Sequence, residues 1–201
     1  MDSAPATSPL GSAAHTPAQT RVIEAALALF AEHGIGGTSL QMIADAIGVT
    51  KAAVYHQYRT KDEIVLAVAE VVLAGLEAAV KAAEAERSRA RTREVLVARM
   101  IGLAVERRRM AGILQRDPIM LRFLDEHGPF RRVMVRVNRV LMGGASDPRA
   151  RVQAAAVAAT IAGAVVHPLA LDLDDETLRT QLLRQVRKLL PGRGRQEGST
   201  R

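Results

Sequence analysis

The sequence predicts an all-α fold, and three observations support that prediction. Between Thr16 and Glu63, consecutive segments each begin with a capping residue and continue with apolar residues at helical spacing. No segment alternates apolar and polar residues as a half-buried strand does. Hydrophobic residues make up 48% of the 201 residues and aromatic residues only 2%, so the chain can bury an aliphatic core.

The first helix is expected to follow a tail. Residues 1–15 are rich in Ser, Ala, Pro and Gly, which is typical of a disordered segment. Thr16 then places a capping hydroxyl before Pro17 at the first helical position, and Gly34 lies where the apolar periodicity stops. The pattern predicts a helix of about four turns between them.

Two short helices and one long helix are expected next. The capping-box pattern Thr38-Ser39-Leu40-Gln41 begins the first of them, and Gly48 ends it after about two turns. Thr50 then caps a short helix over residues 51–58. A further capping box at residues 60–63 opens a long helix that reaches about residue 86.

The remainder of the chain is also predicted to be helical, with softer boundaries. Asp117, Asp147 and Asp174 each stand where an N-cap is expected, the first two directly before proline. The expected organisation is a domain at residues 16–64 and a larger helical domain at residues 65–191. Helices are expected roughly at residues 93–107 with Thr92 as the cap, around 113, and at 118–126, 130–142, 148–166 and 175–190, followed by a flexible basic tail at 192–201.

Composition and charge limit the class of protein. Cysteine is absent, which excludes a disulfide scaffold, a zinc ribbon and thiol chemistry and suits the cytoplasm. The first twenty residues lack the features of a signal peptide, and the most apolar stretch, residues 152–166, is too short to span a bilayer. The net charge of +7 arises after residue 66, because residues 1–66 hold four Lys or Arg against six Asp or Glu. The basic charge is therefore weak evidence for nucleic-acid binding.

The segment at about residues 39–58 has the pattern of a helix-turn-helix. Two short helices that cross steeply need a small residue at their contact, which Ala44 provides, and a residue that tolerates positive φ in the turn, which Gly48 provides. Gln57 stands where an aliphatic residue is common, and Tyr58 is expected to close the core instead. An ordinary helical hairpin is the alternative. The apolar residues around the turn are Ile43, Ile47, Val49 and Val54.

A series of short motifs fills residues 17–64: Phe30-Ala31-Glu32-His33-Gly34, Gly37-Thr38-Ser39-Leu40, Ile43-Ala44, Gly48-Val49-Thr50-Lys51, Val54-Tyr55-His56-Gln57-Tyr58 and Lys61-Asp62-Glu63-Ile64. In these motifs the segment resembles the DNA-binding domain of the TetR family of transcriptional regulators. The resemblance implies a three-helix domain joined by a long helix to a C-terminal domain for ligand binding and dimerisation. It also implies a homodimeric repressor that a small molecule releases from a palindromic operator in double-stranded DNA.

The chain departs from the family pattern at two pairs of positions. Gln57 and Tyr58 stand where the family more often has His and Phe, and Ala52 and Ala53 replace the usual Gly/Pro and Thr/Ser. The two alanines leave few hydrogen-bonding side chains for base readout. They offer only methyl contact with thymine or close backbone approach.

The other candidates for DNA contact lie near helix starts. Thr38 and Ser39 offer hydroxyls that suit a phosphate oxygen, with plain capping as the alternative. Thr50 and Lys51 begin the recognition helix, whose first residues meet base edges, and Lys51 can donate to guanine or to a phosphate. Three further side chains are expected to reach phosphates: Tyr55, His56 and Lys61. The alternative for Tyr55 is a core position, and the alternative for Lys61 is a solvated lysine.

The C-terminal helices are expected to enclose a cavity for an effector. A cavity with few aromatics favours an apolar or weakly polar ligand, and the arginine excess is compatible with an anionic head group. The five histidines show no metal-ligand spacing, and no catalytic constellation or phosphate loop is recognisable, so no metal, cofactor or enzyme activity is expected. The candidates for the cavity wall are Gly75, Leu76, Met100, Phe123, Met134, Asn138 and His167. Ordinary core packing is the alternative for these residues, and for His167 the alternative is a local hydrogen bond.

Two helical faces are expected to form a dimer interface. Residues 154–164 are rich in alanine and residues 178–189 carry a leucine stripe, with packing inside the chain as the alternative. The favoured hypothesis is a ligand-responsive regulator whose partners are DNA, a second copy and an effector, with no membrane. The second hypothesis is a helical binding or scaffold protein without specific DNA binding. Salt-dependent binding to a palindromic duplex distinguishes them.

Overall fold

The computed structural model describes residues 15–190, without the side chains of residues 109 and 114–116. Within this range the chain is helical and contains no strand, which confirms the predicted all-α class. The expected tails, residues 1–15 and 192–201, lie outside the described residues except for His15. The elements are α1 (Pro17–Gly37), α2 (Leu40–Ala46), α3 (Lys51–Gln57), α4 (Lys61–Glu84), α5 (Arg89–Glu106), α6 (Arg108–Arg116), α7 (Pro118–Glu126), α8 (Gly128–Met142), α9 (Pro148–Ala164), the 3-10 helix η1 (Pro168–Ala170) and α10 (Asp175–Leu189).

Thr16, Thr50 and Thr60 cap the N-terminal helices as predicted, but α2 is capped by Ser39, and Thr38 ends α1 instead of opening a capping box with Gln41. Thr16 forms the complete capping box with Gln19 at the start of α1. The hydroxyls of Ser39, Thr50 and Thr60 each accept a hydrogen bond from the backbone N–H three residues further on, at the starts of α2, α3 and α4. These local contacts explain why short, weakly amphipathic segments become helices at these places.

The predicted cap Thr92 is also wrong. The cap of α5 is Ser88, whose hydroxyl accepts a hydrogen bond from the backbone N–H of Arg91. Thr92 lies in the first turn instead, and its hydroxyl donates to the carbonyl oxygen of Ser88. Both residues can cap a helix, and the earlier one extends α5 by one turn. The later caps Asp117, Asp147 and Asp174 are confirmed.

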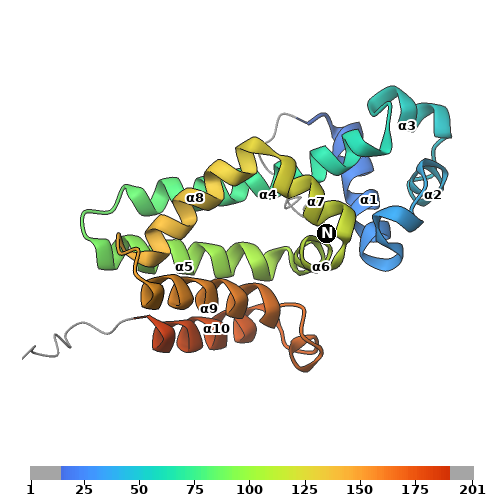
Figure 1. Ribbon diagram of the computed structural model, residues 1–201. Coiled ribbons are helices and arrows are strands. Elements are labelled where there is room, and N and C mark those ends of the chain that lie inside the picture. The colour runs from blue at the N-terminus through green and yellow to red at the C-terminus, as the bar shows by residue number, and fades with distance from the viewer. Residues whose placement is uncertain (1–14, 191–201) are drawn as a thin grey trace, which may run out of the picture.

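The helices form two hydrophobic clusters that share α4. The first cluster fills the space between α1, α2, α3 and the first half of α4, and it also includes residues of α6 and α7. The second cluster joins the second half of α4 to α5, α8, α9 and α10. Figure 1 shows α2 and α3 at one end of the molecule, with the α9–α10 pair against α5 at the other. The continuous α4 therefore connects the two clusters.

The leucine stripe of α10 lies inside the chain's own core. Leu178, Leu182 and Val186 are 2%, 4% and 0% exposed and pack in the second cluster. The expectation that this stripe forms a dimer face is wrong, and packing inside the chain accounts for it. On α9, by contrast, Val152 is 70% exposed. Ala155 and Ala159 follow it at exposed positions, so this face of α9 is uncovered in the single chain.

No helix in residues 15–190 is both long enough and apolar enough to cross a membrane.

Candidate nucleic-acid interface and ligand cavity

The turn between α2 and α3 has the geometry of a helix-turn-helix. Gly48 has φ +68°, and a Cβ placed there meets no atom within 4 Å, so glycine serves the backbone conformation and not close packing. The backbone N–H of Val49 donates to the carbonyl oxygen of Ala44 over 3.0 Å. Arg21 of α1 donates to the carbonyl oxygen of Ile47 over 2.9 Å, which fastens the turn to α1.

The space behind the turn is filled by small and aliphatic side chains. Ile43, Ala44 and Val54 are fully buried in the first cluster. Tyr58 is 7% exposed and closes the same core, as expected from the departure at Gln57. Burial raises the pKa of the Tyr58 phenol, because the charged form loses its hydration. The outward face of α3 is thus held by a packed core.

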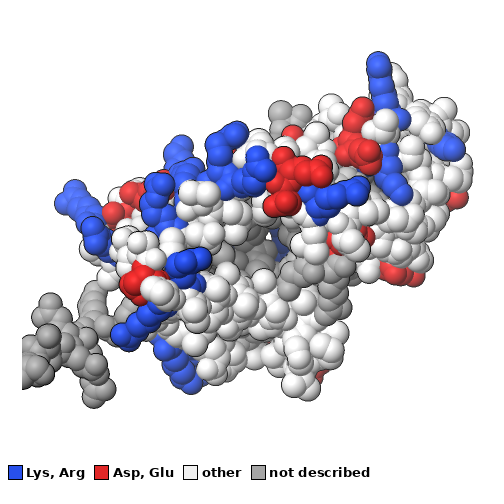
Figure 2. All heavy atoms as spheres, in the orientation of Figure 1, with Lys and Arg blue, Asp and Glu red and all other residues white. Residues whose placement is uncertain are grey.

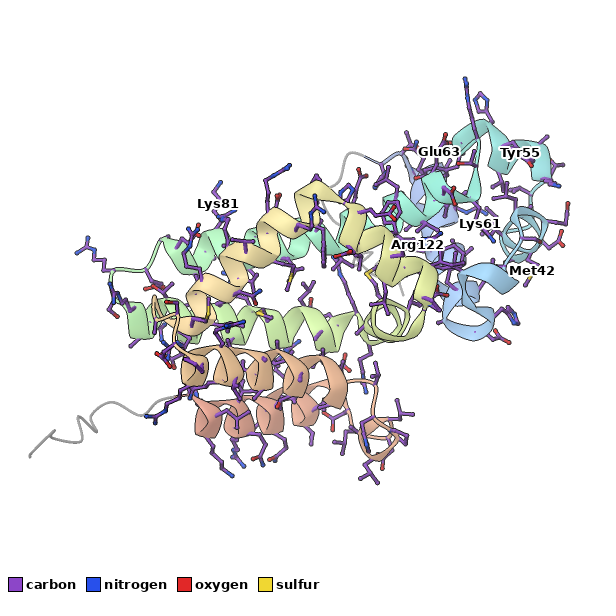
Figure 3. All side chains as sticks on the ribbon, viewed as in Figure 1. Met42, Tyr55, Lys61, Glu63, Lys81 and Arg122 are labelled. Carbon is purple, nitrogen blue, oxygen red and sulfur yellow. The ribbon has the colours of Figure 1, made fainter. Side chains whose placement is uncertain are left out.

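The outward face of α3 presents five exposed residues. The hydroxyl of Thr50 is engaged as the cap of α3, where it accepts a hydrogen bond from the backbone N–H of Ala53. The ammonium group of Lys51 lies 5.6 Å from the centre of the Tyr55 ring, within cation–π range. Tyr55 is 45% exposed, which excludes the core position considered for it, and Figure 3 shows it on α3. The exposed residues are Lys51, Ala52, Ala53, Tyr55 and His56.

The two hydroxyls before α2 have different surroundings. Ser39 is exposed, and its hydroxyl accepts a hydrogen bond from the backbone N–H of Met42 at the start of α2. Thr38 is 2% exposed, and its hydroxyl donates to the carbonyl oxygen of Gly34 over 2.8 Å. The Thr38 side chain is therefore part of the domain interior and is not presented to a phosphate.

Lys61 is engaged inside the domain. Its ammonium group donates to the carbonyl oxygens of Ile35 and Thr38, over 2.7 and 3.0 Å. The side chain is half-buried, and Figure 3 shows it at the start of α4, set back from α3 toward α1. Neither a phosphate contact nor a solvated lysine describes this arrangement. Lys61 joins the start of α4 to the segment between α1 and α2.

Ile35, whose carbonyl oxygen binds Lys61, is also bound through its backbone N–H by Asp117. One carboxylate oxygen of Asp117 accepts a hydrogen bond from the backbone N–H of Ile35 over 2.7 Å. The other oxygen caps α7 by accepting from the N–H groups of Ile119 and Met120. The adjacent Gly34 has φ +73° and interrupts α1, which turns the Ile35 N–H toward α7. We call the set Lys61, Ile35 and Asp117 the Ile35 clamp.

A cavity of about 500 Å³ lies beside α4 in the second half of the molecule. Figure 2 shows a hollow in this central region, where white surface dominates. Its wall combines aliphatic side chains and methionines with a few charged residues, and α7 takes part in it through Leu121, Leu124 and Asp125. The other lining residues are Val72, Leu76, Met100, Leu103, Ala104, Arg107, Met110, Ala111, Phe130, Arg131, Met134, Ala158, Ile161 and Ala162.

The structure brings only some of the sequence candidates to this cavity. Leu76, Met100 and Met134 lie on its wall. Gly75 instead permits close packing of two helices, because a Cβ there would lie 2.7 Å from a methyl group of Leu103. Phe123 packs with the first cluster and stacks on the ring of His127, with 5.7 Å between the centres.

Two further candidates are exposed and lie outside the cavity wall. Asn138 lies on the outer side of α8. His167 caps the 3-10 helix η1, where its Nδ1 accepts a hydrogen bond from the backbone N–H of Leu169 over 3.2 Å. This contact is the local hydrogen bond considered as its alternative.

Arg107 is a cavity residue that the sequence did not reveal. It is half-buried at the junction of α5 and α6, and one guanidinium nitrogen donates to the carbonyl oxygen of Val71 in α4 over 2.8 Å. Burial lowers the pKa of Arg107, because the charged form loses hydration. In the sequence it is one of three successive arginines at a helix end, a pattern that normally indicates a solvated surface.

Among residues 15–190, no group of three or more His, Asp or Glu side chains is placed to hold a metal ion. Two features of the described residues are developed further below. One is a helix-turn-helix with an exposed second helix, and the other is an apolar cavity. A helix-turn-helix of this kind can place its second helix in the major groove of DNA.

The comparison with family models identifies the class more closely. Residues 22–68 match the family described as bacterial regulatory proteins, tetR family. This match covers the helix-turn-helix region, and the solved structures described below share the fold of the chain.

The curated relatives match only in a short segment. A probable acrEF/envCD operon repressor of Escherichia coli K12 is 44% identical over 43 residues, which are 21% of this chain and 20% of the relative. The chain thus matches about a fifth of that relative's length.

Solved structures match over nearly the whole chain. The ketosteroid transcriptional regulator KstR2 of Mycobacterium tuberculosis aligns with a TM-score of 0.71 and 19% identity, over 91% of this chain and 98% of that one. AibR, solved in complex with isovaleryl coenzyme A and operator DNA, aligns with a TM-score of 0.64 and 17% identity, over 84% of this chain and 97% of that one. At these identities the similarity shows a shared fold.

Proposed function

We propose that this protein is a homodimeric repressor that binds a palindromic operator through α3 and is released by a small ligand. The observation that carries the proposal is the exposed face of α3 on a tightly packed helix-turn-helix. The N-terminus of α3 is also free of acidic residues in its first turn, which suits the approach of DNA. The E. coli relative is named as an operon repressor, in agreement with this proposal.

Each exposed residue of the helix-turn-helix has a distinct role in this proposal. Lys51 reads a base edge or a nearby phosphate, and its position over the Tyr55 ring limits its freedom before binding. Ala52 and Ala53 approach thymine methyl groups, and the backbone at Thr50 approaches the groove. Ser39, Tyr55 and His56 contact phosphates. Thr38 and Lys61 support these residues from within the domain.

A second copy of the chain supplies the second recognition helix that a palindromic operator requires. Two recognition helices must lie about 34–36 Å apart, or a multiple of that, to enter successive major grooves on one face of DNA. The exposed face of α9 at Val152, Ala155 and Ala159 suits a second copy, because small side chains allow close approach of helices. We place the dimer at this face and its activity in the cytoplasm, where the DNA of a bacterium lies.

Release by a ligand follows a route that the contacts suggest. The cavity wall includes Leu121 and Leu124 of α7, and α7 begins at Asp117. A ligand that moves α7 displaces Asp117 and with it Ile35. Because Lys61 binds the carbonyl oxygen of Ile35, this displacement also moves the start of α4. The 24 residues of α4 span about 36 Å, so a small tilt changes the separation of the two recognition helices. A ligand that prefers the tilted form lowers the affinity for DNA by population shift.

Selection of duplexes from a genomic pool, followed by fluorescence anisotropy, tests the proposed function. We expect a palindromic preferred site, with affinity that falls as salt rises because phosphate contacts release counterions. Equal affinity for selected and scrambled duplexes, or no DNA binding at low salt, would instead favour the helical binding or scaffold protein.

A further inference from the structure

The cavity wall combines an apolar surface with one half-buried cation. Of its charged residues, Asp125 and Arg131 are exposed, and Arg131 donates to the backbone oxygen of Asp125 at the end of α7. Arg107 is the half-buried one, and it projects from the α5–α6 junction toward α4. The flexible thioethers that share this wall with it are Met100, Met110 and Met134.

These two properties select for different parts of one molecule. Aliphatic and methionine side chains favour an apolar body of adaptable shape. A guanidinium keeps its charge when buried and pairs best with a carboxylate, because its planar N–H groups match the two oxygens. Hydrogen bonds to charged groups contribute more than those between neutral groups, so the anion dominates the choice of ligand.

We propose that the ligand of this cavity is an amphipathic carboxylate, with its aliphatic body along the methionines and its carboxylate on Arg107. This inference rests on the ligand-released repressor proposed above and names the class of its effector. A neutral hydrophobic molecule of equal size binds more weakly, because it leaves the guanidinium without a charged ligand group.

The position of Arg107 also links the anion to α4. Its guanidinium donates to the carbonyl oxygen of Val71, one turn before Gly75, which packs against Leu103 of α5. A carboxylate that engages the guanidinium competes for this donor. The ligand therefore changes the contact between α5 and α4 at the helix that carries Lys61 at its start.

A matched pair of probes tests the inference on the full chain. Decanoate and decanol have the same chain length and differ in the charged group, and their affinities are measured by titration calorimetry and by thermal shift. We expect decanoate to bind the wild type at least about tenfold more tightly, which corresponds to about 1.4 kcal/mol. Arg107→Gln should reduce the preference for decanoate to less than about twofold. The control Arg99→Gln removes an exposed cation of α5 outside the cavity wall and should leave the preference unchanged.

A second variant separates recognition from folding. Arg107→Lys keeps the charge but loses the planar fork, so it should retain an intermediate preference for decanoate. Equal affinity of both probes for the wild type, an undiminished preference in Arg107→Gln, or no binding of either probe would overturn the inference. Operator affinity measured on the same samples is independent of these outcomes. Its absence beside an intact decanoate preference would remove the repressor function and leave the ligand class standing.

Discussion

The helix-turn-helix and the cavity region are built from the same types of aliphatic residue, but they differ in packing. The first has a filled core, and the second contains a cavity. Behind α3, residues such as Ile43 and Val54 are fully buried and fill the space between α1, α2, α3 and the first half of α4. Farther along α4, the helices from α5 to α9 leave a cavity of about 500 Å³ beside it. A filled core holds the DNA-reading face in one geometry, whereas an unfilled one can change shape around a ligand.

This difference in packing indicates that conformational change begins in the cavity region and reaches the helix-turn-helix through their connections. The rigid part is joined to the deformable part by the continuous α4 and by the Ile35 clamp. Figure 2 adds that the Lys and Arg side chains on its visible face gather over α4, α5 and α8, with few over α2 and α3. On this face no broad basic surface covers α2 and α3, so the proposed recognition of DNA depends on the placement of a few side chains.

The largest effect on operator affinity is expected from breaking the proposed dimer, which holds the two copies of α3 at a fixed separation. Ala155→Glu with Ala159→Glu places like charges on the exposed face of α9, so operator affinity should fall on the order of 10²–10⁴-fold as the second head is lost. Light scattering should report monomers. The control Ala78→Glu with Ala98→Glu adds the same charge at exposed positions of α4 and α5 and should stay dimeric. A dimeric α9 variant would place the interface elsewhere.

The packing contrast itself is tested by two truncations. Ile43→Ala leaves a void in the filled core and should cost about 2–5 kcal/mol of unfolding free energy. Met134→Ala enlarges a space that already exists and should cost about 1 kcal/mol. Urea unfolding followed by circular dichroism measures both values. Equal losses would mean that the two regions are packed alike.

The sequence predicts the helix-turn-helix better than the cavity, for a physical reason. Thr50, Gly48 and Ala44 act through residues within a few positions of themselves, so their roles follow from local patterns. Lys61 and Asp117 bind Ile35 across 26 and 82 positions, and no local pattern contains such partners. Their positions at helix starts therefore predict a phosphate contact for Lys61 and capping alone for Asp117.

The two lysines at the DNA-reading end should behave differently. Lys51→Ala removes a base-edge donor, so it should cost about 1–3 kcal/mol on the preferred duplex and relax preference at one base pair per half-site. Lys61→Ala should keep the salt slope of the wild type, because Lys61 is bound to backbone carbonyls. Lys81→Ala removes an exposed charge far along α4 and serves as the control. A slope reduced by about one phosphate contact in Lys61→Ala would assign it to DNA.

The central claim is that the cavity region acts on the rigid reading head through the Ile35 clamp. Asp117→Ser tests it most directly, because serine can still cap α7 but is too short to reach the Ile35 N–H. Operator affinity is measured by anisotropy with and without saturating decanoate. Decanoate should lower the operator affinity of the wild type about 5–150-fold and that of Asp117→Ser less than about twofold. An equal loss in both proteins would contradict the claim, because the ligand would then reach the DNA-reading head without the clamp.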